Sequence, residues 1–197
     1  MNVKTLIFSV LLGFCITLSA QKDDDDKKGK LGILAGWNNA STSADEFDTK
    51  SVSGFYAGAV WEHKFVPSVR FHSGLVYNQN GYRLKDKNTN LENVKYSYLN
   101  VPMIGKFQVA NFYALLGPQI GVRLGGKYTF DDGTPDQKIK GDFKSYDVAA
   151  QLGLGFNVAI IGIEGRYNWG LTDLNKTDGG AAVYNRYFEL GLHVKLW

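Results

Sequence analysis

From Lys30 onwards, hydrophobic and polar residues alternate with a period of two, and no helical period of 3.6 residues persists. This alternation is typical of strands whose two faces meet different surroundings, because successive side chains point to opposite sides of a sheet. Every alternating segment reaches the roughly nine residues that a tilted strand needs to cross a bilayer. The pattern predicts eight strands, at Lys30–Asn38, Val52–Lys64, Ser68–Asn80, Val94–Gln108, Asn111–Gly125, Phe143–Asn157, Ile160–Leu171 and Tyr184–Trp197.

The segment from Ile160 to Leu171 shows what each face contains. One face carries Ile161, Ile163, Tyr167 and Trp169, and the other carries Glu164, Arg166 and Asn168. Both sets of side chains are accommodated if the apolar face contacts lipid and the polar face lines a narrow lumen. Backbone groups within lipid are satisfied only when the sheet closes on itself, so these segments predict a barrel.

The predicted connections alternate strictly between short and long. The short ones lie near "FVP", "VAN" and "NVAI", and the long ones are "NASTSADEFDTKS", "GYRLKDKNTNLEN", "GKYTFDDGTPDQKIKG" and "TDLNKTDGGAAV". Outer-membrane barrels have short periplasmic turns, long extracellular loops and an even number of strands. The predicted fold is therefore all-β, an eight-stranded antiparallel up-and-down transmembrane β-barrel.

Charged residues on the polar faces predict a network inside this barrel. An eight-stranded barrel is just wide enough for side chains to fill its interior. Charges buried there need partners of opposite sign. We expect a structural charge network in the lumen formed by Glu62, Arg70, Lys106, Arg123, Glu164, Arg166 and Glu189.

Aromatic residues are abundant, with 11 Tyr, 12 Phe and 4 Trp, and several lie near the ends of the predicted strands. Tyr and Trp rings favour the interface between membrane and water. We expect interfacial girdles formed by Trp37, Trp61, Tyr77, Tyr167, Trp169 and Trp197, the alternative being ordinary core aromatics.

The N-terminus has the features of a targeting segment. Lys4 precedes the apolar run "TLIFSVLLGFCITL", and Ala20 is a small residue suited to cleavage, so residues 1–20 are predicted to be a secretory signal peptide. The only cysteine, Cys15, lies in this segment, and the large residue before it argues against lipidation. Residues 21–29 include Asp23–Asp26 followed by Lys27 and are interpreted as a charged disordered linker. Residues 30–197 would then form the barrel, in the outer membrane.

Recognisable chemistry is absent from the sequence. The formal net charge of +3 is too small to indicate nucleic-acid binding. The positions of His63, His72 and His193 predict no serine–histidine–carboxylate arrangement, and hydrogen-bonded interior histidines are the better interpretation. The acidic segment Asp131–Asp136 lacks the spacing of a calcium loop. We expect no enzyme, no catalytic residue, no cofactor and no metal site.

Several segments together resemble the PorT-like outer-membrane β-barrel family of Gram-negative bacteria. They are "YSYLNVPMIGKF", "YALLGPQIGV", "LGLGF" and "IEGRYNWGLTDL", within a resemblance that covers roughly Gly32 to Trp197. The resemblance implies an eight-stranded barrel and, by analogy only, a role in protein secretion. Two positions depart from expectation. Pro102 removes a hydrogen-bond donor within a strand, so a bulge or a ladder break is expected there, and Trp197 is out of phase with the apolar face.

These observations favour a small non-enzymatic barrel with a structural or interaction role, which the resemblance extends to secretion. We expect a monomer in contact with outer-membrane lipid and the outer-membrane assembly machinery. Its four long extracellular loops would serve an extracellular or periplasmic protein partner. Two alternatives remain open: a narrow porin-like channel, and a secreted soluble barrel that binds an apolar ligand and has its faces reversed.

Overall fold

The computed structural model describes residues 29–44, 49–84, 91–130, 137–138, 144–175 and 182–196. Its strands are β1 (Lys30–Ala44), β2 (Thr49–Val66), β3 (Val69–Leu84), β4 (Leu91–Val109), β5 (Phe112–Phe130), β6 (Gln137–Lys138), β7 (Tyr146–Val158), β8 (Ile161–Gly170) and β9 (Val183–Lys195). No helix among these residues is long and apolar enough to cross a membrane. The predicted signal peptide lies outside the described residues, as does almost all of the predicted linker.

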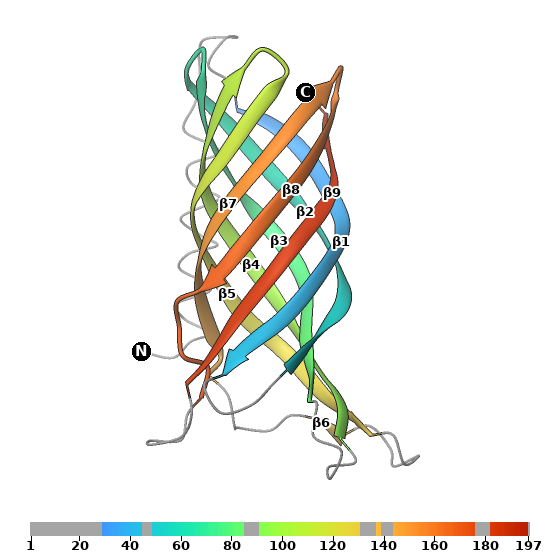
Figure 1. Ribbon diagram of the computed structural model, residues 1–197. Coiled ribbons are helices and arrows are strands. Elements are labelled where there is room, and N and C mark those ends of the chain that lie inside the picture. The colour runs from blue at the N-terminus through green and yellow to red at the C-terminus, as the bar shows by residue number, and fades with distance from the viewer. Residues whose placement is uncertain are drawn as a thin grey trace.

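The eight long strands close into one antiparallel barrel, with strands tilted against its long axis (Figure 1). Hydrogen-bonded neighbours follow the order β4-β3-β2-β1-β9-β8-β7-β5, and pairing of β4 with β5 completes the ring. The short β6 lies outside this ring and pairs with β5 at Lys127 and Tyr128. The predicted eight-stranded fold is confirmed.

Every predicted strand is present, and several extend further than the alternation indicates. β1 runs to Ala44 and pairs with β9 as far as Val183, although the polar residues after Asn38 predicted a long loop. That boundary was wrong because a backbone hydrogen-bond ladder, once neighbouring strands are aligned, can continue without apolar side chains. Only residues 45–48 therefore separate β1 from β2.

The barrel has two different ends (Figure 1). At one end, the turn end, two-residue turns at Pro67–Ser68, Ala110–Asn111 and Ala159–Ile160 join the strands. β1 also begins and β9 also ends there. The other strand ends lie at the opposite end, the loop end, where the chain continues into residues 45–48, 85–90, 131–145 and 171–182. The two-residue turns thus share one end as the sequence predicts, whereas the connections after β1 and β3 are shorter than predicted, with four and six residues.

Buried polar and charged side chains occupy much of the barrel interior, together with small apolar clusters, and apolar side chains cover its outer face. Leu154, Leu116 and Leu190 are 69%, 57% and 48% exposed on the outside, whereas Lys106, Glu164 and Arg166 are 0%, 1% and 2% exposed inside. An outer face of this kind matches lipid, in which apolar side chains lose nothing by exposure. The soluble-barrel alternative requires the opposite arrangement, so the described residues exclude it.

The ladders on both sides of β4 are interrupted near two prolines, Pro102 of β4 and Pro118 of β5. Towards β3, pairing lapses between Asn100 and Met103, and towards β5 it lapses between Pro102 and Gly105. The register is the same before and after each gap, so the interruption is a ladder break without a bulge. A residue in a strand directs its N–H to one neighbour only. The N–H missing at Pro102 accounts for the break towards β3, and the one missing at Pro118 accounts for the break between β4 and β5.

Candidate functional site in the barrel lumen

A cluster of ionisable side chains surrounds Glu62 in the half of the lumen nearer the turn end. Lys106 Nζ donates to Glu62 Oε1 at 2.5 Å, and His72 Nδ1 lies 3.3 Å from the same oxygen. Arg70 and His193 complete the cluster, with nitrogens 3.7 Å from the carboxylate. These residues come from β2, β3, β4 and β9, because the inward positions of these strands reach the same height after the barrel closes. One carboxylate thus serves several positively charged or polarisable groups.

A second ion pair lies within β8. Arg166 donates to Glu164, and Tyr113 Oη donates to the other oxygen of Glu164 at 3.1 Å. Glu164 and Arg166 are two residues apart and therefore share the inward face. The Tyr113 ring also lies 4.1 Å from Lys106 Nζ, in a cation–π contact that links this pair to the Glu62 cluster.

Glycines make room for Tyr113 inside the narrow barrel. A Cβ atom on Gly155 would lie 2.2 Å from the Tyr113 ring, and one on Gly162 would lie 2.7 Å from its hydroxyl. Both distances are too short for real atoms, so a side chain at either position would displace the ring. The alternation of glycine with large residues on the inward faces of β7 and β8 is therefore a packing requirement of the lumen.

The structure brings together most, not all, of the predicted charge network. Glu189 accepts from Asn78 Nδ2 at 2.7 Å and lies opposite Arg166 in the β8–β9 register. Arg123 is half-buried towards the loop end of β5, opposite Tyr98, and lies apart from the Glu62 cluster. Arg70 is 21% exposed, at the mouth of the barrel rather than deep within it. The exposure of the network therefore decreases from Arg70 at the mouth to Glu164 and Arg166 deeper in the lumen.

Uncharged polar side chains form a further layer. The alternation places residues such as Asn168 on the inward face, but it did not predict their hydrogen-bond partners. Gln151 donates to Asn168 at 2.7 Å, and Gln119 donates to the Tyr187 hydroxyl at 2.5 Å. Asn38 donates to Asn78 and, at 2.9 Å, to the carbonyl of Gln79. All of these amide side chains lie at inward positions of the period-two pattern. Their inward position in the period-two pattern could have predicted this layer, because a buried amide side chain needs a hydrogen-bond partner.

A tyrosine cluster occupies the lumen nearer the loop end. Tyr96, Tyr98 and Val94 of β4 are buried together, and Tyr82 and Tyr128 pack against them. None of these tyrosines belongs to the girdle predicted from the sequence. The inward phase of Tyr96 and Tyr98, shared with Val94, would have placed them inside. Side chains thus occupy the lumen from the ion clusters to the loop end.

The predicted girdle residues lie on the outer face where the structure describes them. Trp37 and Trp169 are exposed, Trp61, Tyr77 and Tyr167 are half-covered, and the side chain of Trp197 lies outside the described residues. The Tyr167 and Trp169 rings contact each other with centroids 4.4 Å apart. Their orientation is compatible with an interfacial girdle, which stays a prediction.

The histidines show no catalytic arrangement within the described part of the chain. His72 and His193 are buried beside Glu62, and their rings meet edge to face with centroids 5.6 Å apart. His63 lies outside the lumen, stacked on Trp61 at 5.4 Å. Among the described residues, no cluster of three His, Cys, Asp or Glu side chains is arranged to hold a metal. The acidic segment Asp131–Asp136 is outside that description.

Comparison with known families agrees with this architecture. The family model described as outer membrane protein beta-barrel domain matches residues 19–176. The chain belongs to this family. It is a small outer-membrane barrel, and its location is the outer membrane. The narrower resemblance to PorT-like proteins stays a prediction, and no curated protein sequence matches the chain.

Solved structures with a similar fold come from outer membranes. Neisserial surface protein A is 15% identical, with a TM-score of 0.56 over 86% of this chain and 100% of that one. Ail, the attachment invasion locus protein of Yersinia pestis, in complex with the heparin analogue sucrose octasulfate, is 16% identical, with a TM-score of 0.50 over 86% and 99%. OprG from Pseudomonas aeruginosa is 12% identical, with a TM-score of 0.48 over 86% and 97%. At these identities the similarity concerns the fold alone.

Proposed function

We propose that this outer-membrane barrel is a non-conducting, non-enzymatic scaffold whose activity lies in the segments at its loop end. The observation that carries the proposal is the filled lumen. Lys106, Arg166, Tyr113 and Tyr187 are all buried in its cross-section. Lys106 is held by Glu62, Arg166 and Tyr113 by Glu164, and Tyr187 by Gln119. Ions passing through would have to displace buried, paired charges, which is costly.

The competing hypothesis is a narrow porin-like channel, and the lumen also contains what such a channel would need. Many of its lining side chains are polar, although Leu34, Val76 and Ile104 are also buried there. Arg70 and Lys195 lie at the mouth at the turn end. The two hypotheses differ in whether water forms a continuous path past the Glu62 cluster and Arg166. Conductance distinguishes them directly.

The test is single-channel recording with the refolded chain in planar lipid bilayers. We expect no discrete current steps from the parent chain. A variant with Glu164→Ala and Arg166→Ala removes two buried charges of opposite sign, so the net charge of the lumen is unchanged, and it is expected to produce steps because it opens the lumen. The gel shift on heating that is characteristic of folded barrels controls for folding of both chains. Steps of similar size and frequency in the parent would favour the porin-like channel.

A role in protein secretion follows only from the resemblance to PorT-like proteins, and we include it in the proposal on that basis. The loop-end segments would then contact an extracellular or periplasmic protein partner. Cells lacking the chain are compared with cells restored by the parent chain or by a chain whose 85–90 and 131–145 segments are replaced with glycine–serine sequences. Loss of secreted proteins in the first and last of these cells supports the role, and unchanged secretion in all of them rejects it.

Export to the outer membrane would require the N-terminal segment. The proposal includes cleavage after Ala20 and insertion as a monomer by the outer-membrane assembly machinery. N-terminal sequencing of the chain recovered from outer membranes tests the cleavage, with Gln21 as the expected first residue.

A further inference from the structure

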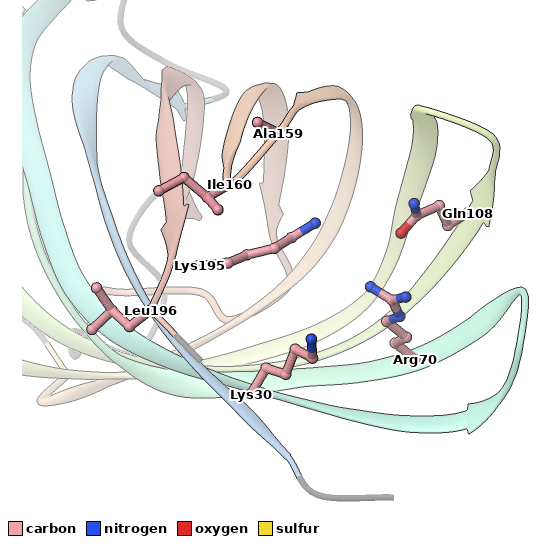
Figure 2. Close-up of a pocket in the computed structure, with 7 residues that line it drawn as sticks. All are labelled: Lys30, Arg70, Gln108, Ala159, Ile160, Lys195 and Leu196. Atoms are coloured by element: carbon pink, nitrogen blue, oxygen red, sulfur yellow. The ribbon is translucent and has the colours of Figure 1, made fainter. Parts of the chain in front are cut away.

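A polar pocket of about 320 Å³ opens at the turn end of the lumen. Lys30 of β1, Arg70 of β3 and Lys195 of β9 line it, together with Gln108 of β4. Figure 2 shows the three cationic side chains directed from different strands towards the same space. The ion pairs deeper in the lumen do not line this pocket. Arg70 belongs both to the pocket lining and to the Glu62 cluster.

The lining of this pocket contains three cations and no carboxylate. Such a concentration of like charge is unfavourable unless an anion compensates for it. Lys195 Nζ donates to Asn157 Oδ1 at 2.9 Å, and this neutral acceptor leaves the lysine charge unbalanced. The pocket therefore has a positive potential that its own hydrogen bonds do not cancel.

The neighbouring carboxylate, Glu62, has a single negative charge, which Lys106 and Arg70 share, so it cannot also balance Lys30 and Lys195. Its Oε2 atom lies 3.7 Å from Arg70, beyond hydrogen-bond distance, while Oε1 accepts directly from Lys106 at 2.5 Å. Arg70 Nε is buried and has no hydrogen-bond partner among the described residues. The hydrogen-bonding capacity of the guanidinium is thus not fully used by the protein.

We propose that this pocket, here called the mouth site, binds a phosphate group. The planar guanidinium of Arg70 can donate two parallel hydrogen bonds to phosphate oxygens, and Lys30 and Lys195 supply the remaining charge. The volume accommodates a phosphate group with several waters, each of which takes about 30 Å³ in the liquid. The mouth site is a binding site, and it needs no chemical step.

Two sources of phosphate fit the surroundings of the mouth site. Ile160 and Leu196 form an exposed apolar rim beside the cations, as a phospholipid headgroup with its chains would require. Soluble phosphate would use the cations alone. The site itself is independent of the proposed scaffold function. The inference that the mouth site faces the periplasm rests on the orientation proposed above. A barrel that conducts ions, or a negative result in the secretion test, would leave the mouth site itself unaffected.

The test uses the full chain, refolded in a maltoside detergent that contains no phosphate, and titrates it with inorganic phosphate by calorimetry at low salt. Arg70→Gln and Lys195→Gln each remove one cation from the mouth site. Lys50→Gln and Arg186→Gln remove one each from exposed positions on the half of the barrel nearer the loop end and serve as matched controls. We expect at least a tenfold weaker affinity from each mouth variant, no measurable binding from the double variant, and less than a twofold change from the controls.

Equal weakening by mouth and control variants, or no binding by a parent chain that shows the heat-dependent gel shift, would overturn the proposal. A second titration with a short-chain phosphatidic acid below its micelle concentration distinguishes the sources. Tighter binding of the lipid that depends on Arg70 identifies a headgroup site, and equal or weaker binding identifies soluble phosphate. Either result supports a phosphate site.

The acidic run Asp23–Asp26 precedes Lys30 in the chain by only a few residues, so its carboxylates are potential competitors for the same cations. Replacing the four aspartates with asparagine tests this directly. Tighter phosphate binding by that variant would show that the mouth site also accepts carboxylates of its own chain, and unchanged binding would show that phosphate meets an open site. Both results presuppose binding by the parent chain.

Discussion

At the scale of single residues, the unusual feature of this barrel is the number of charges that it buries. Glu62, Lys106, Glu164 and Arg166 are each at most 3% exposed. A buried charge is tolerated when a partner of opposite sign lies within contact, and removal of one partner leaves the other uncompensated. Glu164 and Arg166 form such a pair within one strand.

This pairing predicts a non-additive response to mutation. Arg166→Met should lower the free energy of unfolding by about 3–5 kcal/mol, because it leaves Glu164 buried with only the Tyr113 hydroxyl as a partner. Adding Glu164→Gln removes the orphaned charge and should recover at least about 1 kcal/mol of that loss. Urea unfolding in lipid vesicles, followed by tryptophan fluorescence, measures both values. Arg186→Met at an exposed position serves as the control, and a loss below about 1 kcal/mol from Arg166→Met would contradict the pairing.

At the scale of elements, the turns and connections determine how the strands are joined. Ala110 and Ala159 each occupy the first position of a two-residue turn, with φ angles of 52° and 53°. Such positive angles suit the right-handed twist of a hairpin, but they place the alanine Cβ atom in a crowded conformation. Glycine avoids that crowding.

Ala159→Gly and Ala110→Gly should therefore stabilise the barrel, each by up to about 1 kcal/mol. The left-handed conformation costs an alanine about 1–2 kcal/mol, and the greater freedom of glycine in the unfolded chain offsets about 0.5–1 kcal/mol of the gain. Ala57→Gly, within β2, is the control and should destabilise the barrel by about 0.5–1 kcal/mol. Urea midpoints that fall in all three variants would disprove the turn assignment.

The carboxylate of Asp173 joins the two ends of the connection that follows β8. Asp173 Oδ1 accepts from the backbone N–H of Val183 at 2.9 Å and from that of Asn175 at 3.0 Å. Leu174 N also donates to the Val183 carbonyl at 2.8 Å. These bonds join both ends of the 171–182 connection, outside the strands, and hold the pKa of the Asp173 carboxyl below its ordinary value.

The sign of this pKa shift predicts how acid affects the connection. Because the folded pKa lies below the unfolded value of about 3.9, the stabilisation is fully present above that value and is lost as the pH falls through the folded pKa. Protection of the Val183 amide from hydrogen exchange, corrected for the intrinsic rate, should therefore decrease on acidification. Asp173→Ala should show the weaker protection at every pH. An equally steep decrease in that variant would assign the effect to another group.

At the scale of the whole molecule, the barrel separates its connections by length. The three two-residue turns and both ends of the barrel domain lie at the turn end, and the longer connections lie at the loop end (Figure 1). In outer-membrane barrels short turns face the periplasm and longer loops face outwards. The predicted orientation follows from this asymmetry.

Single cysteines test the orientation on intact cells. The only native cysteine, Cys15, lies in the predicted signal peptide, so new thiols would be the only ones in the mature chain. A membrane-impermeant maleimide should label Lys87→Cys and Asp132→Cys, and it should reach Ser68→Cys and Asn111→Cys only after the outer membrane is permeabilised. Labelling in the reverse order would invert the barrel, and uniform labelling of all four would place it elsewhere than the outer membrane.

The sequence by itself determined the number of strands, their order and the face on which each side chain lies. Period-two alternation contains that information directly, because residues such as Ile163 and Glu164 cannot share a face. It also indicated which charges would be inside, since lipid tolerates apolar side chains and a lumen tolerates polar ones. The disturbance at Pro102 was predictable for the same local reason, the missing N–H.

Only the tertiary structure decided which inward residues meet. Alternation makes Glu62, Glu164 and Glu189 equivalent, yet the first binds Lys106, the second Arg166 and the third Asn78. Those partners depend on the height of each strand around the closed barrel, which is set by hydrogen-bond register and shear rather than by local sequence. Closure likewise extended β1 to Ala44 through polar residues and brought Lys30 and Lys195 together at the mouth, because backbone pairing and proximity across a barrel are properties of the whole ring.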